Sequence, residues 1–251
     1  MDSTIDPVSE PSTGEAWDDR TLRLLGEDGV ERLRRSSVLV VGVGGVGGYA
    51  AEMLARSGVG NMTIVDSDNV AESNVNRQLI ATTSTVGRPK VELFADRFRD
   101  INPEINVNPK IEFVDAEKIE DLFCNGGYDY VVDAIDTVAP KVALIAHCLR
   151  HRIPIVSSMG AGGRIDVTKV GYYDLWETRE DGLARAVRQK LKAMSLRRPL
   201  KVVASTEKPM SHSLIQLETV NKRSSYGTLA TIPALFGIFL ANHVIRKLTG
   251  I

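Results

Sequence analysis

Four glycines are the first residues in the 251-residue chain whose spacing suggests chemistry. They follow an apolar, β-branched run at residues 37–43 and precede a stretch rich in Ala and Leu; they are Gly42, Gly44, Gly45 and Gly47. Glycine lets the backbone turn tightly and approach a phosphate, and the N-terminus of a following helix offers N–H groups to an anion. Asp66 ends the next apolar run, where a carboxylate can hold a ribose hydroxyl. The spacing predicts a nucleotide-binding loop; the alternative is a tight turn without a ligand.

A second group of polar residues after Asp66 distinguishes between kinds of nucleotide. Arg77 and Lys90 are cations that can neutralise a polyphosphate, and Asn74 and Gln78 lie beside Arg77. Asp136 follows the fourth apolar run and can hold Mg²⁺. A nicotinamide site has no need of two extra cations and a metal-binding acid. The pattern favours ATP and Mg²⁺ as cofactors, with Asp136 as the metal ligand.

An alternation of strands and helices must position these residues. Apolar, β-branched runs predict buried parallel strands, and apolar residues at helical spacing predict the helices between them. The repeated unit predicts an α/β fold with a doubly wound, Rossmann-like and largely parallel sheet. The expected strands are 37–43, 61–66, 105–114, 128–134 and 153–157, and the expected helices are 49–57, 89–101, 116–123 and 141–150.

The pattern changes after residue 159, where glycines cluster. Strands are expected near residues 164–170 and 202–205, a charged helix at 182–194 and a closing helix at 229–248. We expect this C-terminal extension to complete the same domain. The expected organisation is a disordered acidic tail (1–19) and one domain (20–251), with an ATP-binding half (20–165) and a substrate-contacting half (166–251).

Charge, cysteine content and the length of the apolar runs limit the partners and the location of the protein. There are 31 Lys and Arg against 32 Asp and Glu, so the net charge of −1 gives no overall basic field, and no DNA partner is expected. Cys124 and Cys148 are the two cysteines and form no CxxC pair, which favours a reducing compartment and a cytoplasmic location. The apolar run at 231–241 is shorter than the roughly 20 residues that span a bilayer, so membrane contact is expected to be peripheral at most.

Four motifs resemble the ubiquitin-activating-enzyme-like superfamily, which includes the activators of molybdopterin and thiamine sulfur carriers. The motifs are GVGGVG (42–47), DSDNVAESNVNRQ (66–78), VGRPK (86–90) and DAIDT (133–137). In that superfamily ATP adenylates a carboxylate. The resemblance implies that Arg23 reaches into the ATP site of a partner subunit, and hence a homodimer. The catalytic residues it implies are Arg23, Arg77, Lys90 and Asp136, and the implied nucleotide-binding residues are Gly42, Gly44, Gly45, Gly47, Asp66, Asp68, Asn74, Arg77, Gln78, Lys90 and Asp136.

Within the superfamily the chain is most similar to the tRNA threonylcarbamoyladenosine dehydratase branch. The stretch DYVVDAIDTVAPKVALIAHCLRHRIPIVSSMGAGGRIDVTKV (129–170) carries this resemblance, together with residues 204–208 and the closing SYGT…PALFGIF segment. It implies an ATP-dependent dehydration of threonylcarbamoyladenosine beside the tRNA anticodon. The carboxylate would be adenylated with release of pyrophosphate, and the neighbouring carbamoyl group would close a ring and expel AMP.

A basic segment offers a surface for the tRNA that the resemblance implies. Residues 179–201 contain eight basic and two acidic residues. Such a run is often only a solvated helix face, whereas the resemblance favours phosphate contacts. Thr206 and Glu207 match a dehydratase motif and would line the substrate pocket, although loop packing accounts for them equally well. The basic residues expected to contact tRNA are Arg179, Arg185, Arg188, Lys190, Lys192, Arg197 and Arg198.

Three other functions remain open from the sequence. An activator of a ubiquitin-like or sulfur-carrier protein would share the ATP site but lacks the zinc-binding and thioester cysteines often found there. A nicotinamide-dependent oxidoreductase would use the glycines and Asp66 but leave Arg77, Lys90 and Asp136 without a shared purpose. A non-catalytic, nucleotide-dependent tRNA-binding module differs only in lacking activity.

Overall fold

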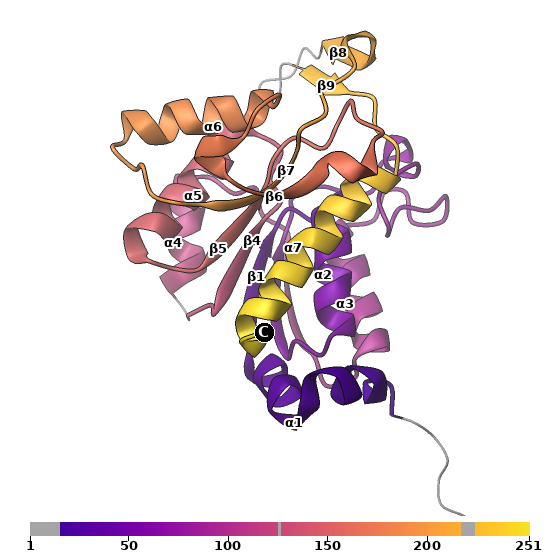
Figure 1. The fold of residues 1–251 in the computed structure, drawn as a ribbon. Coiled ribbons are helices and arrows are strands. Elements are labelled where there is room, and N and C mark those ends of the chain that lie inside the picture. Colours follow the sequence, from indigo (N-terminus) through magenta and orange to yellow (C-terminus); the bar gives the residue numbers. More distant parts are fainter. Residues whose placement is uncertain (1–15, 125–126, 217–223) are drawn as a thin grey trace, which may run out of the picture.

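The computed structural model describes residues 16–124, 127–216 and 224–251, and most of the acidic tail expected at residues 1–19 lies outside them. The elements follow one another as expected for a βα repeat (Figure 1). The helices are α1 (Asp19–Arg35), α2 (Gly47–Arg56), α3 (Lys90–Ile101), α4 (Ala116–Cys124), α5 (Val138–His151), α6 (Gly182–Ala193) and α7 (Thr231–Thr249). The strands are β1 (Ser37–Val41), β2 (Asn61–Val65), β3 (Asn106–Lys110), β4 (Tyr130–Asp133), β5 (Ile155–Ser158), β6 (Val170–Asp174), β7 (Lys201–Ser205), β8 (Leu214–Gln216) and β9 (Ser224–Tyr226).

Seven strands form one sheet in the order β3-β2-β1-β4-β5-β7-β6. All neighbours in it are parallel except β6, which runs antiparallel to β7 at the edge. The predicted α/β fold with a doubly wound, largely parallel sheet is therefore confirmed. Strands from both sides of residue 165 share this sheet.

The prediction of a strand at residues 164–170 was wrong. A short 3₁₀ helix at Val167–Lys169 lies within that range, residues 164–166 form no strand, and β6 begins only at Val170. Asp166 explains the difference, because its side chain accepts a hydrogen bond from the Thr168 N–H and so closes a local turn. Side chains of this type compete with regular structure for backbone groups.

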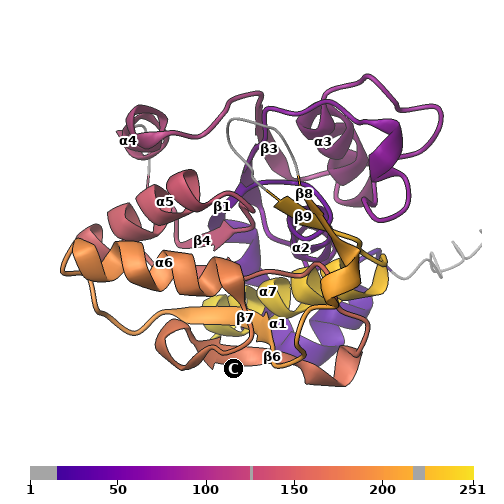
Figure 2. The ribbon, with the colours of Figure 1, turned by 90° about the horizontal axis from the view of Figure 1, so that it is seen from above.

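Helices cover both faces of the sheet, which explains why the strand sequences are continuously apolar. Val38 and Val40 of β1 pack into a core with α2, α3 and α7, whereas Leu39 and Val41 pack into a second core with α4, α5 and α6. Figure 2 shows the two sets of helices on opposite sides of the sheet.

The apolar run near the C-terminus lies in α7, which packs along α2. Gly237 makes this close approach possible, because a Cβ there would lie 2.4 Å from the Val46 carbonyl oxygen and 2.7 Å from the Tyr49 Cβ. Among the described residues, no helix is both long enough and apolar enough to cross a bilayer.

Candidate nucleotide site

The glycine loop lies at the carboxyl edge of the sheet, between β1 and α2. Gly42 has a φ of 85°, and a Cβ there would lie 2.9 Å from the Ala134 carbonyl oxygen. A Cβ on Gly47 would lie only 1.7 Å from the Gly42 carbonyl oxygen. Both positions therefore require glycine for backbone geometry and packing. Gly44 and Gly45 have more room, since the nearest atoms to a Cβ on either lie 3.4–3.6 Å away. Both are half-buried, so their backbone is the part of the loop that we expect to contact a phosphate.

Asp66 follows β2, and its carboxylate links the end of this strand to the glycine loop. Its Oδ2 accepts a hydrogen bond from the Val43 N–H at 2.8 Å, and its Oδ1 accepts one from the Asp68 N–H at 2.9 Å. Burial raises the pKa of this carboxyl, and the nearby Lys90 partly opposes the rise. A carboxylate fixed to the loop at the end of β2 is in the position where a ribose is bound in this type of fold.

Lys90 begins α3 and pairs with Asp68. Its Nζ lies 2.8 Å from the Asp68 Oδ2, and the lysine side chain is 4% exposed whereas that of the aspartate is 67% exposed. A buried ammonium held beside Asp66 and the loop can serve a phosphate group that approaches the same edge. Asp68 lies at the same edge through this ion pair, and its part in nucleotide binding stays a prediction.

The segment after the short 3₁₀ helix Glu72–Asn74 lies alongside the glycine loop. Asn74 is used locally, since its Oδ1 accepts a hydrogen bond from the Ala71 N–H at 3.1 Å. Arg77 donates from Nη1 to the Ser73 carbonyl oxygen at 2.7 Å, and its Cγ would lie 3.6 Å from a Cβ on Gly45. The structure thus brings Arg77 to the loop.

Gln78 gives an independent indication of a ligand. It is buried beside Gly44, with its Nε2 3.6 Å from where a Cβ on that glycine would be. Its Oε1 is buried and has no hydrogen-bond partner among the residues that the structure describes. An unpaired buried acceptor costs free energy, which a donor on a bound nucleotide would offset. With Asp66 and the loop, this orphan atom supports the fit of ATP.

Asp136 lies in the loop that follows β4 and is exposed at the same edge of the sheet. Among the described residues no group of three or more His, Cys, Asp or Glu side chains could hold a metal. Mg²⁺ usually takes one or two carboxylates and completes its shell with phosphates and water. Asp136 therefore fits as the one protein carboxylate on Mg²⁺ that a nucleotide carries.

Sequence reasoning missed a buried polar cluster below this loop. Asp133, Lys141 and Ser157 are all fully buried, and the Lys141 Nζ lies 2.6 Å from the Asp133 Oδ2. The signal was present in the sequence, because Lys141 interrupts an otherwise apolar helix soon after the DAIDT motif.

Arg23 is not brought to the nucleotide site of its own chain. It lies on α1, where its Nη2 is 2.7 Å from the Asp19 Oδ2. Helix α1 packs at the C-terminal end of α7, where the Arg32 Nη1 donates to the Thr249 carbonyl oxygen at 2.8 Å (Figure 1). The glycine loop contacts the other end of α7, at Pro233. A helix of 19 residues is about 28 Å long, which separates the two sites.

The expected tRNA-binding residues divide into two groups on and around α6. Arg188 is used inside the protein, since its Nη1 donates to the Leu175 and Thr178 carbonyl oxygens, each at 3.1 Å. Arg198 donates to the Leu149 carbonyl oxygen at 3.0 Å, and the Arg197 guanidinium lies 5.6 Å from the centre of the Trp176 ring. The remaining residues are exposed and make no ion pair among the described residues: Arg179, Arg185, Lys190 and Lys192.

Thr206 and Glu207 follow β7 at the carboxyl edge. The Glu207 carboxylate accepts hydrogen bonds from the Ile165 and Asp166 N–H groups, and its nearest contact is 2.9 Å. The Thr206 N–H donates to the Lys169 carbonyl oxygen, and Thr206 itself is exposed. Glu207 therefore has a packing role in the structure, and contact with substrate stays a prediction for both residues.

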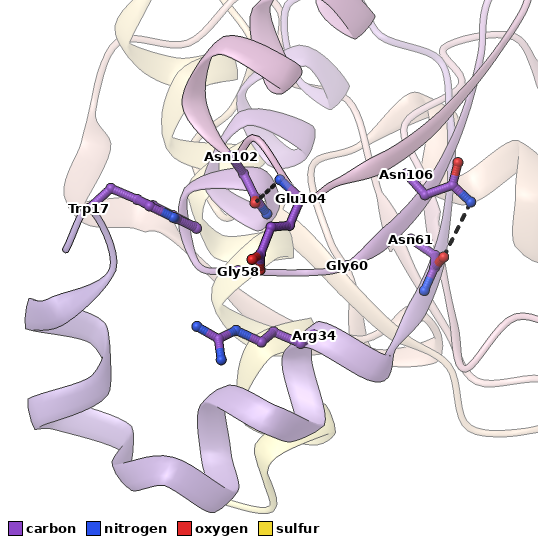
Figure 3. Close-up of a pocket in the computed structure, with 8 residues that line it drawn as sticks. All are labelled: Trp17, Arg34, Gly58, Gly60, Asn61, Asn102, Glu104 and Asn106. Carbon is purple, nitrogen blue, oxygen red and sulfur yellow. Dashed lines mark hydrogen bonds between the residues drawn. The ribbon is translucent and has the colours of Figure 1, made fainter.

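Two cavities lie away from the glycine loop. One, of about 200 Å³, is at the amino edge of the sheet, where Asn61 and Asn106 begin β2 and β3 (Figure 3). Asn106 donates to Asn61 at 3.3 Å, and Trp17 and Arg34 line the opposite side (Figure 3). The other, of about 250 Å³, lies between β6, β7 and the end of α7. Neither contains a residue expected to bind the nucleotide.

Comparisons with known proteins identify the family of the chain. The family model described as the ThiF family matches residues 18–251. A tRNA threonylcarbamoyladenosine dehydratase from Bacillus subtilis is 40% identical over 232 residues, which is 89% of this chain and 91% of that protein. The crystal structure of the Escherichia coli dehydratase in complex with ATP superposes with a TM-score of 0.84 at 37% identity and covers 93% of each chain. A molybdopterin-synthase adenylyltransferase from Escherichia coli is 39% identical over 61% of each chain. The protein belongs to the ThiF family.

Proposed function

We propose that the protein is an ATP-dependent tRNA threonylcarbamoyladenosine dehydratase. The observation that carries this proposal is the extent of the similarity to the Bacillus subtilis dehydratase, which spans 89% of this chain and 91% of that protein. The similarity to the molybdopterin-synthase adenylyltransferase covers only 61% of each chain. The similarity that continues beyond the part shared with the adenylyltransferase therefore favours the dehydratase.

The proposed reaction has two steps, adenylation of a carboxylate and closure of a ring. A carboxylate oxygen of the threonylcarbamoyl group attacks the α-phosphorus of ATP, and the bond to pyrophosphate breaks. The carbamoyl group of the same nucleoside then attacks the activated carbonyl carbon and loses a proton, and AMP leaves with the carboxylate oxygen. The net change is the loss of one water from the nucleoside. Because nucleophile and electrophile are on one molecule, correct orientation contributes up to about 7–11 kcal/mol to the second step.

The residues at the carboxyl edge have separate tasks in this proposal. The backbone at Gly44 and Gly45 contacts phosphate, and Asp66 holds the ribose. Arg77 and Lys90 stabilise negative charge on the triphosphate as it develops. The protein supplies position and charge at this edge, and none of these roles requires a cysteine nucleophile. Cys148 would be unsuited to that task, because burial raises the pKa of its thiol to about 12.

Mg²⁺ and a second copy of the chain complete the proposed site. Asp136 would hold Mg²⁺, which supplies charge neutralisation at the phosphates when bound. Arg23 would act in the site of the partner subunit of a homodimer, because α1 lies far from the glycine loop of its own chain. The tRNA would contact the exposed basic residues of α6. A cytoplasmic location and peripheral membrane contact at most remain predictions.

The reaction is tested with purified protein, Mg²⁺, ATP and tRNA carrying threonylcarbamoyladenosine. Mass spectrometry of gently digested tRNA should show the loss of one water from that nucleoside, dependent on ATP and accompanied by AMP. Asp136→Ala and Arg77→Ala should abolish the loss while remaining folded. If the tRNA is unchanged and ATP–pyrophosphate exchange instead requires a carrier protein, the chain is an activator of such a protein.

A further inference from the structure

The buried cluster below the nucleotide site is fully removed from water. Lys141 donates from Nζ to the Asp133 Oδ2 at 2.6 Å and to the Ser157 Oγ at 3.1 Å. Ser157 in turn donates to the same Asp133 Oδ2 at 2.6 Å. Burying an ion pair has a large desolvation cost, and well-packed apolar replacements are often at least as stable. Stability alone therefore does not explain why charges occupy this position.

The cluster fixes the backbone that leads from β4 to Asp136. The Asp133 Oδ1 accepts a hydrogen bond from the Ile135 N–H at 3.1 Å. The Ala134 N–H between them donates to the Val41 carbonyl oxygen at 2.9 Å, at the end of β1. Both oxygens of Asp133 are thus used, one toward Lys141 and Ser157 and one toward the turn. This turn directly precedes Asp136.

The same segment also supports the glycine loop. A Cβ on Gly42 would lie 2.9 Å from the Ala134 carbonyl oxygen, and a Cβ on Gly47 would lie 2.9 Å from the Ala134 Cβ. Ala134 is therefore packed between the buried cluster and the loop expected to contact phosphate. A shift of Asp133 would move the loop contact and Asp136 together.

The position of Lys141 is unfavourable without Asp133. Its N–H bonds to the Thr137 carbonyl oxygen in the first turn of α5, so its ammonium lies near the positive end of the helix dipole. The Asp133 carboxylate compensates for both positive charges. Ser157 connects this pair to β5, so that one cluster joins β4, α5 and β5.

We propose that Asp133, Lys141 and Ser157 are positioning residues for nucleotide-bound Mg²⁺. They hold the turn after β4 so that the Asp136 carboxylate meets the metal at a fixed place. This inference rests on the nucleotide site and the Asp136 role proposed above. Partners that orient a metal ligand typically account for about 10–100-fold in metal affinity or activity.

Two neighbouring serines provide a matched test. Ser157 and Ser158 are adjacent in β5 and are both buried, but the Ser158 Oγ donates to the Met159 carbonyl oxygen and not to the cluster. ATP affinity is measured by calorimetry for Ser157→Ala and Ser158→Ala, once with Mg²⁺ and once with EDTA. The ratio of ATP affinity with Mg²⁺ to ATP affinity with EDTA should be about tenfold smaller for Ser157→Ala than for the wild type. This is the low end of the range for partners that orient a metal ligand. Affinity in EDTA should fall less than affinity with Mg²⁺, since only the support of the glycine loop is then affected, and Ser158→Ala should match the wild type in both conditions.

A second variant separates the buried charges from the hydroxyl. Asp133→Asn/Lys141→Met leaves no unpaired charge, and its asparagine oxygen can still accept from the Ile135 N–H. It should remain folded by thermal unfolding and should also lose the Mg²⁺-dependent gain in affinity. The inference is overturned if either variant keeps the full gain, or if both serine variants lose it equally. Wild-type protein that fails to bind ATP would instead refute the proposed nucleotide site.

Discussion

At the scale of single residues, the structure distinguishes glycines that packing requires from glycines that leave room beside the backbone. Gly42 and Gly47 are required by packing, whereas Gly44 and Gly45 leave space beside the backbone. Asp66 fixes the loop through its two oxygens, and its place at the end of β2 suits a ribose. Gln78 lies beside Gly44 and has a buried oxygen without a hydrogen-bond partner within the described part of the chain.

Asp66→Asn should weaken ATP binding and alter the pH dependence of stability. Burial raises the pKa of Asp66 above 3.8, so its stabilising contribution is complete below pH 3.8 and is lost as pH rises through the folded-state pKa. Asparagine does not ionise, so the variant does not lose stability in this way. Its melting temperature relative to wild type should therefore rise as pH increases above 3.8. ATP affinity should fall by about 1.5–3 kcal/mol, the contribution of a hydrogen bond to a charged group.

Calorimetry and thermal unfolding across pH check both parts of this prediction. The raised pKa would be contradicted by a constant difference in melting temperature between variant and wild type. The ribose role would be contradicted by unchanged ATP affinity in a folded variant.

At the scale of elements, α6 presents exposed cations from a helix whose start is anchored near the nucleotide edge. The Asp181 side chain caps this start by accepting from the Ala184 N–H at 2.8 Å and also accepts from the Gly160 N–H at 2.9 Å. Arg164, which is buried, lies 3.5 Å from Asp181 and strengthens the anchor. The helix therefore holds its basic residues at a defined distance from the site.

Removal of the exposed cations of α6 should weaken tRNA binding without unfolding the protein. Arg185→Gln/Lys190→Gln/Lys192→Gln should lower tRNA affinity and reduce the slope of log affinity against log salt by about one for each phosphate that the variant no longer neutralises. Arg188→Gln is the matched comparison, because this arginine bonds to the Leu175 and Thr178 carbonyl oxygens. It should lower the melting temperature and leave the salt dependence unchanged.

Filter binding of tRNA over a range of salt concentrations measures this effect. If the triple variant keeps the wild-type salt slope, the exposed basic residues of α6 are only a solvated face.

Helix α7 carries a pH response on the opposite side of the sheet. The Nε2 of His243 lies 3.0 Å from the Tyr130 Oη, and burial, with the cations Lys247, Lys201 and Arg246, lowers the pKa of His243 to about 4. The neutral imidazole therefore contributes stability that is complete above pH 6.5 and is lost as pH falls toward 4. His243→Gln should flatten the fall in melting temperature over this range. An equally steep fall in the variant would assign the acid sensitivity to other groups.

Much of the fold could be predicted from the sequence because local patterns and tertiary packing agree. The β1 and β4 sequences are apolar on both faces, and the structure places helices on both faces. The prediction failed at Val167–Lys169, where the Asp166 side chain favours a turn over a strand. The glycines, Asp66, Arg77 and Lys90 could be predicted to meet because they follow parallel strands.

The buried cluster could not be predicted in the same way. Asp133, Lys141 and Ser157 come from three elements, and their convergence depends on the register of β4 with β5 and on the rotation of α5. The internal hydrogen bonds of Arg188 could not be predicted for a similar reason. Its type and spacing are those of a surface cation, but the loop after β6 brings two carbonyl oxygens within its reach.

At the scale of the whole molecule, we expect the proposed site to be complete only in a homodimer. Arg23 lies far from the glycine loop of its own chain, so the proposed role of this arginine requires the site of a partner subunit. Two inactive variants, Arg23→Ala and Asp136→Ala, should therefore complement each other. In a mixed dimer one site combines an intact Asp136 with the intact Arg23 of the other subunit, and dehydration should return after the two proteins are mixed and allowed to exchange.

Complementation is measured by water loss from the modified tRNA at equal total protein. Each variant alone, taken through the same exchange, is the control. If the mixture is no more active than the variants alone, although mixed dimers form, Arg23 does not act across an interface.

Transfer of an isotopic label from the carboxylate tests the central claim, adenylation of the tRNA nucleoside, most directly. The tRNA is prepared with ¹⁸O in both carboxylate oxygens of threonylcarbamoyladenosine and is incubated with the protein, Mg²⁺ and ATP. Mass spectrometry of the released AMP should show one ¹⁸O atom for each nucleoside that loses water, because AMP leaves with a carboxylate oxygen. Unlabelled AMP, or label in inorganic phosphate together with ADP, would contradict the account.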